Sequence, residues 1–462
     1  MFMIKDKKIF LGVIVWIIFT AFVLRNSRYL SEIELACHVF SGILILTFFY
    51  VYKKSNSITV LISTIVFLFL AVVQPLWSIL CVEEVNLSGH LLREDLISPQ
   101  YRVAHIIYIS LFFMVFIYAV AYIVKAKRRN TFANILAKSG RLKSFFIHID
   151  PIVIAVIYSV LGSLFLYNTN LLNPISPSRV EHSGIFVYVF KLITVLCWGI
   201  CFTGINVRSK KSARIISNLL IAILFSLPQM IMGSRSVLFF FVGQLVILEI
   251  LIIKSRNDGK LSIAKKDIAI LTPLLIIGFV VLILSISIGN FYRGDLTHIV
   301  PRQFLFNRIT GIVDGIITSK YTYANSYNRL PISNLFLLWL FPGKGTNMSL
   351  FYSVNLRGQK VSDPNAWARP AYASGLLYAG VFGVIFLALV AAVVLSVLEL
   401  LIKESLLQDN VFAAAAFGYS YVYIFFTFIL EGDADIMFTF LWISVAVIIL
   451  DAFISIRIKK KE

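Results

Sequence analysis

Basic side chains gather in one segment, residues 290–371, which lies between two apolar stretches. Its nine basic residues are Arg293, Arg302, Arg308, Lys320, Arg329, Lys344, Arg357, Lys360 and Arg369. Six of them are arginine, whose rigid fork of donors pairs bidentately with phosphate and stays charged in a partly dry site. The segment therefore predicts a binding site for a phosphate-bearing ligand, and a solvated basic loop is the alternative interpretation.

Arg235 lies in a short turn, Met-Gly-Ser-Arg-Ser, between two further apolar stretches. Gly233 lets the chain reverse, and Ser234 or Ser236 can cap the helix that starts there. Arg235 would then stand beside a helix N-terminus, whose free N–H groups also attract phosphate. Lys191, near the end of another apolar stretch, can extend its ammonium group toward a membrane–water boundary.

Candidates for proton transfer and for sugar contacts lie in the same basic segment. Asp295, Asp314 and His298 are available there, and His298 is the only histidine of the segment. A histidine can be neutral at physiological pH and can therefore accept a proton. Tyr323 and Trp367 offer rings that stack on sugars, although an aromatic belt at a membrane surface would use the same rings.

An acidic turn near the C-terminus carries carboxylates at Glu431, Asp433 and Asp435. Such a turn can hold a divalent ion, orient an acceptor sugar or supply a general base. We interpret Glu431 and Asp433 as substrate contacts and expect no bound metal, while a solvated turn is the alternative. Elsewhere, His105 has no neighbouring motif, and His38 is predicted to be structural.

The elements that would position these residues follow from composition. Of the 462 residues, 59% are apolar and 14% are charged, whereas a soluble protein has roughly 45–50% apolar and about 25% charged residues. This composition excludes a soluble enzyme, a disordered chain and a secreted disulfide scaffold. Twelve stretches are long enough to cross a bilayer as helices, because lipid cannot satisfy an open backbone. They lie near 9–24, 35–52, 58–81, 103–124, 151–167, 186–206, 215–232, 236–253, 268–289, 372–402, 411–430 and 436–456.

The basic residues outside segment 290–371 predict the orientation of these spans. With the N-terminus in the cytosol, the loops on that side hold 26 of the 42 Lys and Arg residues, as the positive-inside rule requires. Both termini are then cytosolic, and most of the net charge of +19 reflects topology rather than nucleic-acid binding. We predict three regions: nine spans over 1–289, a long outer loop with an amphipathic helix over 290–371, and three spans with a basic tail over 372–462.

The chain resembles the O-antigen or oligosaccharide repeat-unit polymerases of the Wzy type over most of its length. The likeness rests on the many-span plan with one long, late outer loop, on the Gly-Ser-Arg turn at Arg235, and on the segment from Arg369 to Gly383. In this segment ten residues separate Arg369 from Gly380, which matches an Arg-x10-Gly pattern described for such polymerases. The related O-antigen ligases have a histidine where this chain has Arg369.

The resemblance implies an all-α, GT-C-like glycosyltransferase that acts on the outer face of the bacterial cytoplasmic (inner) membrane. It would transfer the growing glycan from undecaprenyl pyrophosphate to a new lipid-linked repeat unit, with inversion at the anomeric centre. Neither a metal nor another cofactor would be needed. Its partners would be the undecaprenyl-pyrophosphate-linked oligosaccharide and membrane lipids, with a chain-length regulator as a further candidate and no nucleic acid.

Residue roles follow from the chemistry of the leaving group. Fixed cations near the departing pyrophosphate stabilise the transition state more than the ground state. The predicted catalytic residues are Arg235, Arg293, Arg302 and Arg369, with His298 and Asp295 for proton transfer. The predicted substrate contacts are Arg308, Arg329, Arg357, Lys191, Tyr323, Trp367, Glu431 and Asp433.

Four other functions compete with this interpretation, and ordinary solute transport ranks last among them. A lipid-linked oligosaccharide flippase needs charges along its spans. The charges within the predicted spans are few, namely Lys191, Glu249, Glu399 and Asp451. A GT-C transferase that uses a lipid-monophosphate sugar would use an acidic pair such as Glu32 and Glu34 together with a divalent metal. An O-antigen ligase would act on the same face, and Arg369 counts against it.

Overall fold

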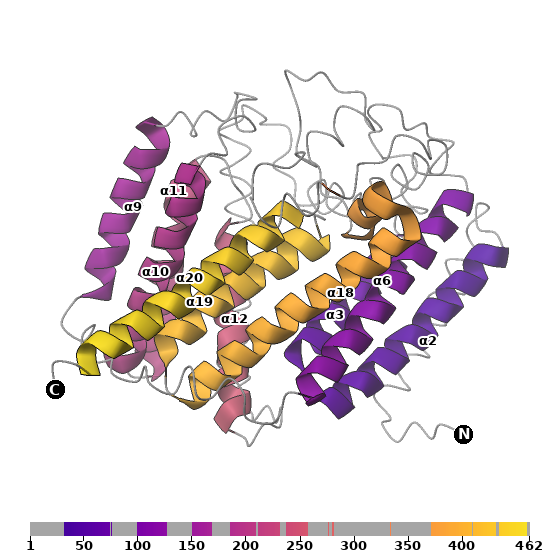
Figure 1. Ribbon diagram of the computed structural model, residues 1–462, viewed down its shortest axis with the longest axis horizontal. Helices are drawn as coiled ribbons and strands as arrows, with labels where there is room; N and C mark the ends of the chain where they lie inside the picture. The colour runs from indigo at the N-terminus through magenta and orange to yellow at the C-terminus, as the bar shows by residue number, and fades with distance from the viewer. Residues whose placement is uncertain are drawn as a thin grey trace. The chain divides into compact units, whose positions relative to one another are not determined.

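The structure is a computed structural model, and the secondary-structure elements of its described residues are helices (Figure 1). It describes residues 32–73, 99–126, 150–168, 185–208, 211–231, 237–256, 371–408, 410–430 and 434–459, with the single positions 75, 276, 280 and 333. This part of the chain agrees with the prediction of an all-α protein.

The described helices follow the apolar stretches of the sequence. They are α2 (Glu32–Ser55), α3 (Ile58–Leu68), η1 (Phe69–Val73), α6 (Pro99–Ala126), α9 (Pro151–Asn168), α10 (Ile185–Arg208), α11 (Lys211–Ile231), α12 (Val237–Arg256), α18 (Ala371–Leu407), α19 (Val411–Tyr423), η6 (Ile424–Leu430) and α20 (Ala434–Lys459). Ten of the twelve predicted spans coincide with them, the third only as far as Val73, while 9–24 and 268–289 lie outside the described residues. Within the described part, five helices are long and apolar enough to cross a membrane: α2, α6, α10, α18, and α19 continued into η6.

Local sequence explains where several helices begin and turn. Asn56, between α2 and α3, has a φ of 53°, a left-handed conformation that asparagine adopts more readily than most residues. Ser57 then caps α3 by accepting a hydrogen bond from the Val60 N–H. Asn410 caps α19 in the same way and accepts from the Ala413 N–H at 3.1 Å. Such caps satisfy N–H groups that have no partner within the helix.

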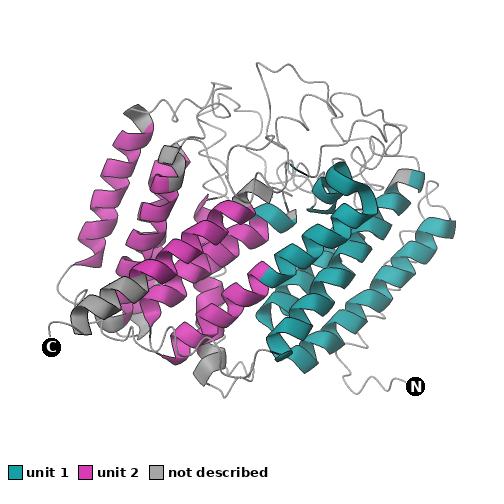
Figure 2. Cartoon of the chain, in the orientation of Figure 1, with its two compact units in different colours: residues 1–126, 304–393, 427–434 teal, residues 127–303, 394–426, 435–462 magenta. Residues whose placement is uncertain are grey.

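Two compact units divide the chain, and α18 and η6 contribute residues to both (Figure 2). Unit 1 comprises residues 1–126, 304–393 and 427–434. In it, α2, α3 and α6 pack against one another around aromatic side chains. The Phe67 ring lies 5.2 Å from that of Phe48 and 5.5 Å from that of Phe113, measured between centroids, so all three helices meet at Phe67.

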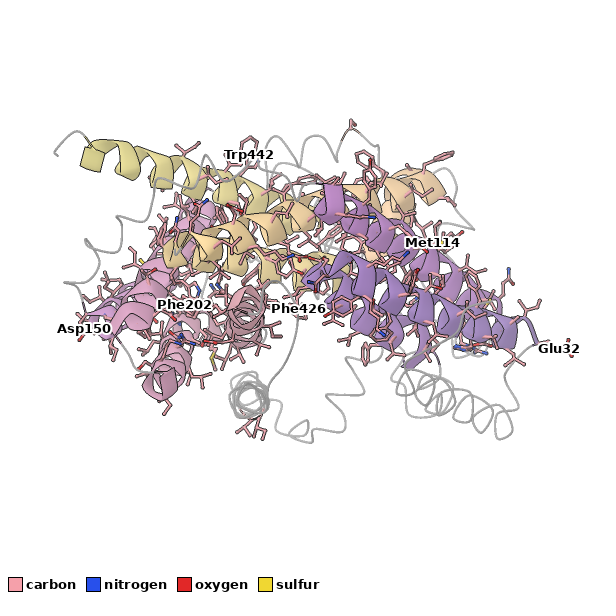
Figure 3. The ribbon with its side chains drawn as sticks, turned by 90° about the horizontal axis from the view of Figure 1, so that it is seen from below. Glu32, Met114, Asp150, Phe202, Phe426 and Trp442 are labelled. Carbon is pink, nitrogen blue, oxygen red and sulfur yellow. The ribbon has the colours of Figure 1, made fainter. Side chains whose placement is uncertain are left out.

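Unit 2 comprises residues 127–303, 394–426 and 435–462. Its helices α9, α10, α11, α12 and α19 pack around the fully buried Trp198, whose ring contacts those of Phe225 and Phe241. Gly199 of α10 faces the ring of Phe412 in α19, and a small residue of this kind lets two membrane helices approach closely. Apolar side chains cover the described helices (Figure 3).

The predicted tenth span, 372–402, is not one straight helix. It falls in α18, a run of 37 residues in which Ala379 and Gly380 leave the helical conformation. Gly380 has φ 60° and ψ −139°, a backbone conformation that essentially only glycine adopts without strain. We call residues 371–379 the half-helix, and the remainder of α18 continues from Gly380.

The half-helix packs tightly against the next turns of α18. A Cβ atom added to Gly375 would lie 2.6 Å from the backbone nitrogen of Val384, so the two backbones touch at this point. Tyr372 and Leu377 are buried on the half-helix. A break in a helix at membrane depth is tolerated where protein covers it, and the burial of the half-helix meets this condition.

Candidate functional site

The structure describes one of the predicted site residues, Lys191, together with Gly380 of the Arg-x10-Gly segment. Gly380 stands at the break in α18, where its conformation requires glycine. Helix α12 begins at Val237, directly after the turn predicted to cap it. The other predicted site residues lie outside the described residues: Arg235, Arg293, Asp295, His298, Arg302, Arg308, Tyr323, Arg329, Arg357, Trp367, Arg369, Glu431 and Asp433.

Lys191 lies in the second turn of α10, in unit 2, and is half-buried. Its ammonium group is 5.6 Å from the centre of the Phe440 ring in α20, which is within the range of a cation–π interaction. The Phe440 ring also contacts Tyr423 and Tyr419, at centroid distances of 4.5 and 5.8 Å. Lys191 thus places a positive charge beside a buried group of aromatic rings.

A second group of polar side chains is buried in unit 1: Glu34 and His38 from α2, Arg102 and His105 from α6, and Tyr372 from the half-helix. We call it the outer cluster, because the topology predicted from the sequence would place it on the outer side. Arg102 donates from Nε to one carboxylate oxygen of Glu34 at 2.6 Å and from Nη2 to the other at 2.9 Å. Both side chains are 0% exposed. A two-point contact of this kind fixes the relative orientation of α2 and α6 as well as neutralising both charges.

His105 links three elements of unit 1. Its Nδ1 lies 2.5 Å from the Tyr372 hydroxyl, and its Nε2 lies 3.3 Å from the carbonyl oxygen of Leu70 in η1. In a π-helical pattern the Leu70 carbonyl would accept from residue 75. That residue is a proline, which has no N–H to donate. The carbonyl is therefore free to accept from His105.

His38 is one helical turn after Glu34 on α2 and is completely buried. Neither of its ring nitrogens has a hydrogen-bond partner in the structure. A buried polar group without a partner carries a desolvation cost, so such groups are uncommon and call for an explanation. His38 therefore adds a proton-binding side chain to the outer cluster whose hydrogen-bonding capacity is not used by the fold.

Sequence reasoning did not identify the outer cluster. Glu34 and His38 are four residues apart and Arg102 and His105 are three apart, so each pair shares a helix face. His38 and His105 also lie inside predicted apolar spans, where ionisable residues are rare and usually functional. These two signals were available in the sequence, but only the packing of α2, α6 and the half-helix shows that they belong to one cluster.

Charges near the other ends of the predicted spans are neutralised in pairs. In unit 2, Arg214 of α11 donates from Nη2 to both carboxylate oxygens of Glu249 in α12, at 2.8 and 3.0 Å. Lys403 lies 2.5 Å from Glu399, one turn earlier on α18. Glu249 and Glu399, two of the acidic residues within the predicted spans, are therefore engaged by neighbouring cations.

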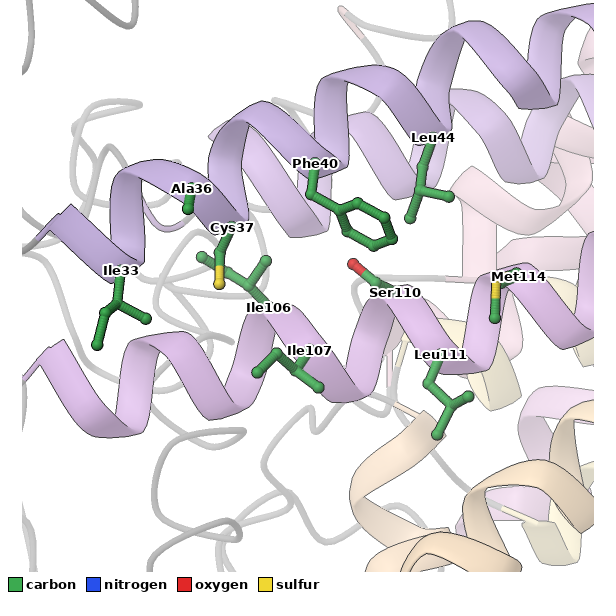
Figure 4. A pocket seen from close by; sticks show the side chains of 10 residues that line it. All are labelled: Ile33, Ala36, Cys37, Phe40, Leu44, Ile106, Ile107, Ser110, Leu111 and Met114. Carbon is green, nitrogen blue, oxygen red and sulfur yellow. The ribbon is translucent and has the colours of Figure 1, made fainter.

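Unit 1 also has an apolar groove of about 380 Å³ between α2 and α6 (Figure 4). It is lined by Ile33, Ala36, Cys37, Phe40, Leu44, Ile106, Ile107, Ser110, Leu111 and Met114. The Ser110 hydroxyl faces this groove and has no hydrogen-bond partner, while Phe40 and Ile107 are about half exposed. A groove of this composition can hold the hydrocarbon chain of a lipid.

Comparison with known proteins does not add a family to this description. No protein-family model matches the chain, and neither does any curated protein or solved structure. The class that the fold and composition support is an all-helical protein with several apolar helices suited to a membrane.

Proposed function

We propose that this chain crosses the bacterial cytoplasmic membrane twelve times, with both termini in the cytosol. The distribution of Lys and Arg between alternate loops supports this topology. The positions of the described helices support it further, because each coincides with a predicted span. In this arrangement the starts of α2, α6 and α18 face outward, so the outer cluster lies near the outer surface.

The activity that we propose is polymerisation of a surface polysaccharide such as an O-antigen or a capsule. The growing glycan would be transferred from undecaprenyl pyrophosphate to the non-reducing sugar of a new lipid-linked repeat unit, without a metal. The observation that supports this most is the break at Gly380, because the glycine of the Arg-x10-Gly segment occupies a position that only glycine can fill. The nine basic residues of 290–371 provide the charge that a pyrophosphate would need.

Catalysis in this proposal is mainly electrostatic. Arg235, Arg293, Arg302 and Arg369 would hold the pyrophosphate oxygens, whose negative charge grows as the bond from the anomeric carbon to the phosphate oxygen breaks. The acceptor hydroxyl would lose its proton to His298 or Asp295 as it attacks that carbon. The predicted substrate contacts, among them Lys191 in its aromatic surroundings, would hold the sugars.

The pairing of charges in the described spans favours this activity over a flippase. A flippase must offer its substrate a path through the membrane, and such paths are marked by ionisable side chains within the helices. Glu249 and Glu399 instead pair with Arg214 and Lys403. A transport path along these helices would have to break both ion pairs.

The geometry of Glu34 likewise disfavours a transferase that uses a lipid-monophosphate donor and a divalent metal. Such an enzyme would need the acidic residues Glu32 and Glu34 as metal ligands or as a base. Both carboxylate oxygens of Glu34 accept hydrogen bonds from Arg102, and the side chain is 0% exposed. A metal at Glu34 would therefore have to displace a buried arginine.

The decisive test deletes the gene and examines lipid-linked and surface glycans by gel ladder and mass spectrometry. If the chain is a polymerase, the ladder should collapse to a single repeat unit that is still made, exported and attached. Repeat units trapped on the cytosolic side would indicate a flippase, and full-length chains left on the carrier lipid would indicate a ligase.

Complementation with variants then tests the arginines. Arg369→Ala and Arg235→Ala should each lower the rate of elongation by about 10²–10³-fold, by analogy with the loss of one preorganised donor. Lys344→Ala and Lys360→Ala are matched controls, because they remove a positive charge from the same segment at positions without an assigned role. Equal losses in all four variants would show that only the total charge of the loop matters.

A further inference from the structure

The half-helix is held on α6 by a contact that the proposed chemistry does not use. The Tyr372 side chain, in the first turn of the half-helix, is 1% exposed. Its hydroxyl lies 2.5 Å from Nδ1 of His105. Tyr108, one turn further along α6, stacks on the Tyr372 ring at a centroid distance of 6.0 Å. The start of the half-helix therefore makes both polar and aromatic contacts with α6.

The two hydrogen bonds of His105 determine which of its ring nitrogens carries the proton. A neutral imidazole has one donor nitrogen and one acceptor nitrogen. The Leu70 carbonyl can only accept, so Nε2 carries the proton and Nδ1 accepts from the Tyr372 hydroxyl. Moving Tyr372 away would remove the hydrogen-bond donor of the buried His105 Nδ1, which is unfavourable. The contact therefore favours one position of the half-helix.

The far end of the half-helix does not impose that position. Gly380 allows the chain to change direction there. The angle between the half-helix and the remainder of α18 is therefore set by the packing at Gly375 and by the contacts of the first turn of the half-helix. In the sequence, Arg369 precedes Ala371 by two residues, a reach of at most about 7 Å. Only two residues therefore separate Arg369 from Tyr372 along the chain.

We propose that His105 is a positioning residue: through Tyr372 it holds the half-helix in the position that the proposed elongation reaction requires. The consequence for catalysis rests on the proposed function, whereas the contact itself does not. The feature that matters is the hydrogen bond between Tyr372 and residue 105. A side chain that restores a hydrogen-bond acceptor at position 105 should therefore restore activity.

The activity arm uses the full chain in membranes and the single-unit lipid-linked oligosaccharide isolated from the deletion strain. Tyr372→Phe and His105→Ala should each lower kcat by up to about 10²-fold, as expected for misplaced catalytic groups, with KM little changed. The double variant should be no worse than either single variant, because both remove the same contact. His105→Gln should regain part of the activity, since its amide oxygen can accept from Tyr372.

Tyr122→Phe is the matched control for the activity arm. Tyr122 lies on the same helix, α6, and is 76% exposed. The control should keep full activity. Unchanged kcat in Tyr372→Phe, or a loss in Tyr122→Phe of the same size as that in Tyr372→Phe, would overturn the proposal.

A labelling experiment measures the accessibility of the half-helix independently of enzymatic activity. The four native cysteines are replaced, and Ala373→Cys places a thiol on a half-helix residue that is 0% exposed. This thiol should resist maleimide in membranes and should react at least about tenfold faster when Tyr372→Phe or His105→Ala is added, as local opening becomes easier. Unchanged protection in both variants would overturn the proposal, even if the native chain elongates no glycan and the proposed function fails. Protein amount and elution by gel filtration identify any variant that misfolds. If Tyr372→Phe or His105→Ala misfolds, His105→Gln is compared with the native chain instead.

Discussion

Each unit buries an arginine–glutamate pair between neighbouring helices, and the two pairs are built differently. In unit 1, Arg102 uses two nitrogens, Nε and Nη2, for the two carboxylate oxygens of Glu34. In unit 2, Arg214 directs Nη2 alone at both oxygens of Glu249, and its Nε has no hydrogen-bond partner. The first pair uses the planar shape of the guanidinium group, whereas the second uses chiefly its charge.

The surroundings of the two arginine–glutamate pairs also differ. His38, His105 and Tyr372 belong to the same group of buried polar residues as Arg102 and Glu34, and the hydrogen bond between Tyr372 and His105 connects the half-helix to α6. The pair in unit 2 connects two consecutive helices, α11 and α12, at the ends that we predict to face the cytosol. We infer that the contact through two nitrogens of Arg102 fixes the relative orientation of α2 and α6. The contact through Nη2 of Arg214 alone holds α11 and α12 together without fixing their orientation as closely.

The largest expected effect comes from breaking the pair in unit 1. Arg102→Leu would remove the arginine that neutralises the buried Glu34 carboxylate, which should lower the free energy of unfolding by about 3–5 kcal/mol. Replacing both residues, with Arg102→Met and Glu34→Leu, should recover most of this loss because no buried charge remains. Equilibrium unfolding in mixed detergent micelles would measure both values. If the double variant were as unstable as the single one, packing rather than charge would account for the loss.

Arginine-to-lysine replacements separate shape from charge. Lysine keeps the charge but not the fork, so Arg102→Lys should lose one charged hydrogen bond, worth about 1.5–3 kcal/mol. Arg214→Lys should lose less, because one donor nitrogen already serves both oxygens of Glu249. The same unfolding experiment applies to both. Equal losses would contradict the difference that we draw between the two pairs.

A glycine in each unit tests the break in α18. Gly380→Ala should destabilise the protein by about 1–3 kcal/mol, because its backbone conformation is essentially reserved for glycine. Gly243→Ala is the control: it lies within α12, where an added Cβ would meet its nearest neighbours at 3.7 Å, an ordinary contact distance. It should be neutral or slightly stabilising. Thermal unfolding of the two variants in detergent would compare them.

The smallest effect concerns the lysine of the predicted site. Lys191→Met should cost about 1 kcal/mol through the lost cation–π contact with Phe440. Lys54→Met in unit 1 is its counterpart, since the Lys54 ammonium lies 4.7 Å from the centre of the exposed Tyr50 ring, and its cost should be smaller. If Lys191 binds substrate, only Lys191→Met should also raise KM for the lipid-linked repeat unit. An unchanged KM would limit Lys191 to a structural role.

Helix positions were predictable because the bilayer imposes a simple rule on sequence. A helix that crosses lipid must be apolar for about 20 residues, so helices such as α6 and α12 can be located from composition alone. The break in α18 was less accessible. Gly380 was recognised as part of a motif, but neither its positive φ nor the close approach at Gly375 follows from the apolar character of span 372–402.

The site shows the same division more sharply. Clusters of arginine within 290–371 and at 232–236 predict phosphate chemistry, and these predictions concern residues beyond those that the structure describes. The outer cluster is the converse case: Glu34, Arg102 and Tyr372 carry no common motif, because they are 68 and 270 residues apart in the sequence. Sequence reasoning treated His38 as structural and His105 as isolated, and the hydrogen bond from Tyr372 to His105 corrects the second interpretation.

By itself, the sequence determined the apolar, helical class of the protein and the placement of the described helices. These properties depend on local composition, because a helix that crosses lipid must be apolar along its length. The tertiary structure decided which buried charges are paired, which histidine is held between two partners, and where a predicted span breaks. Those outcomes depend on contacts between residues far apart in the chain, and only packing brings such residues within hydrogen-bonding distance.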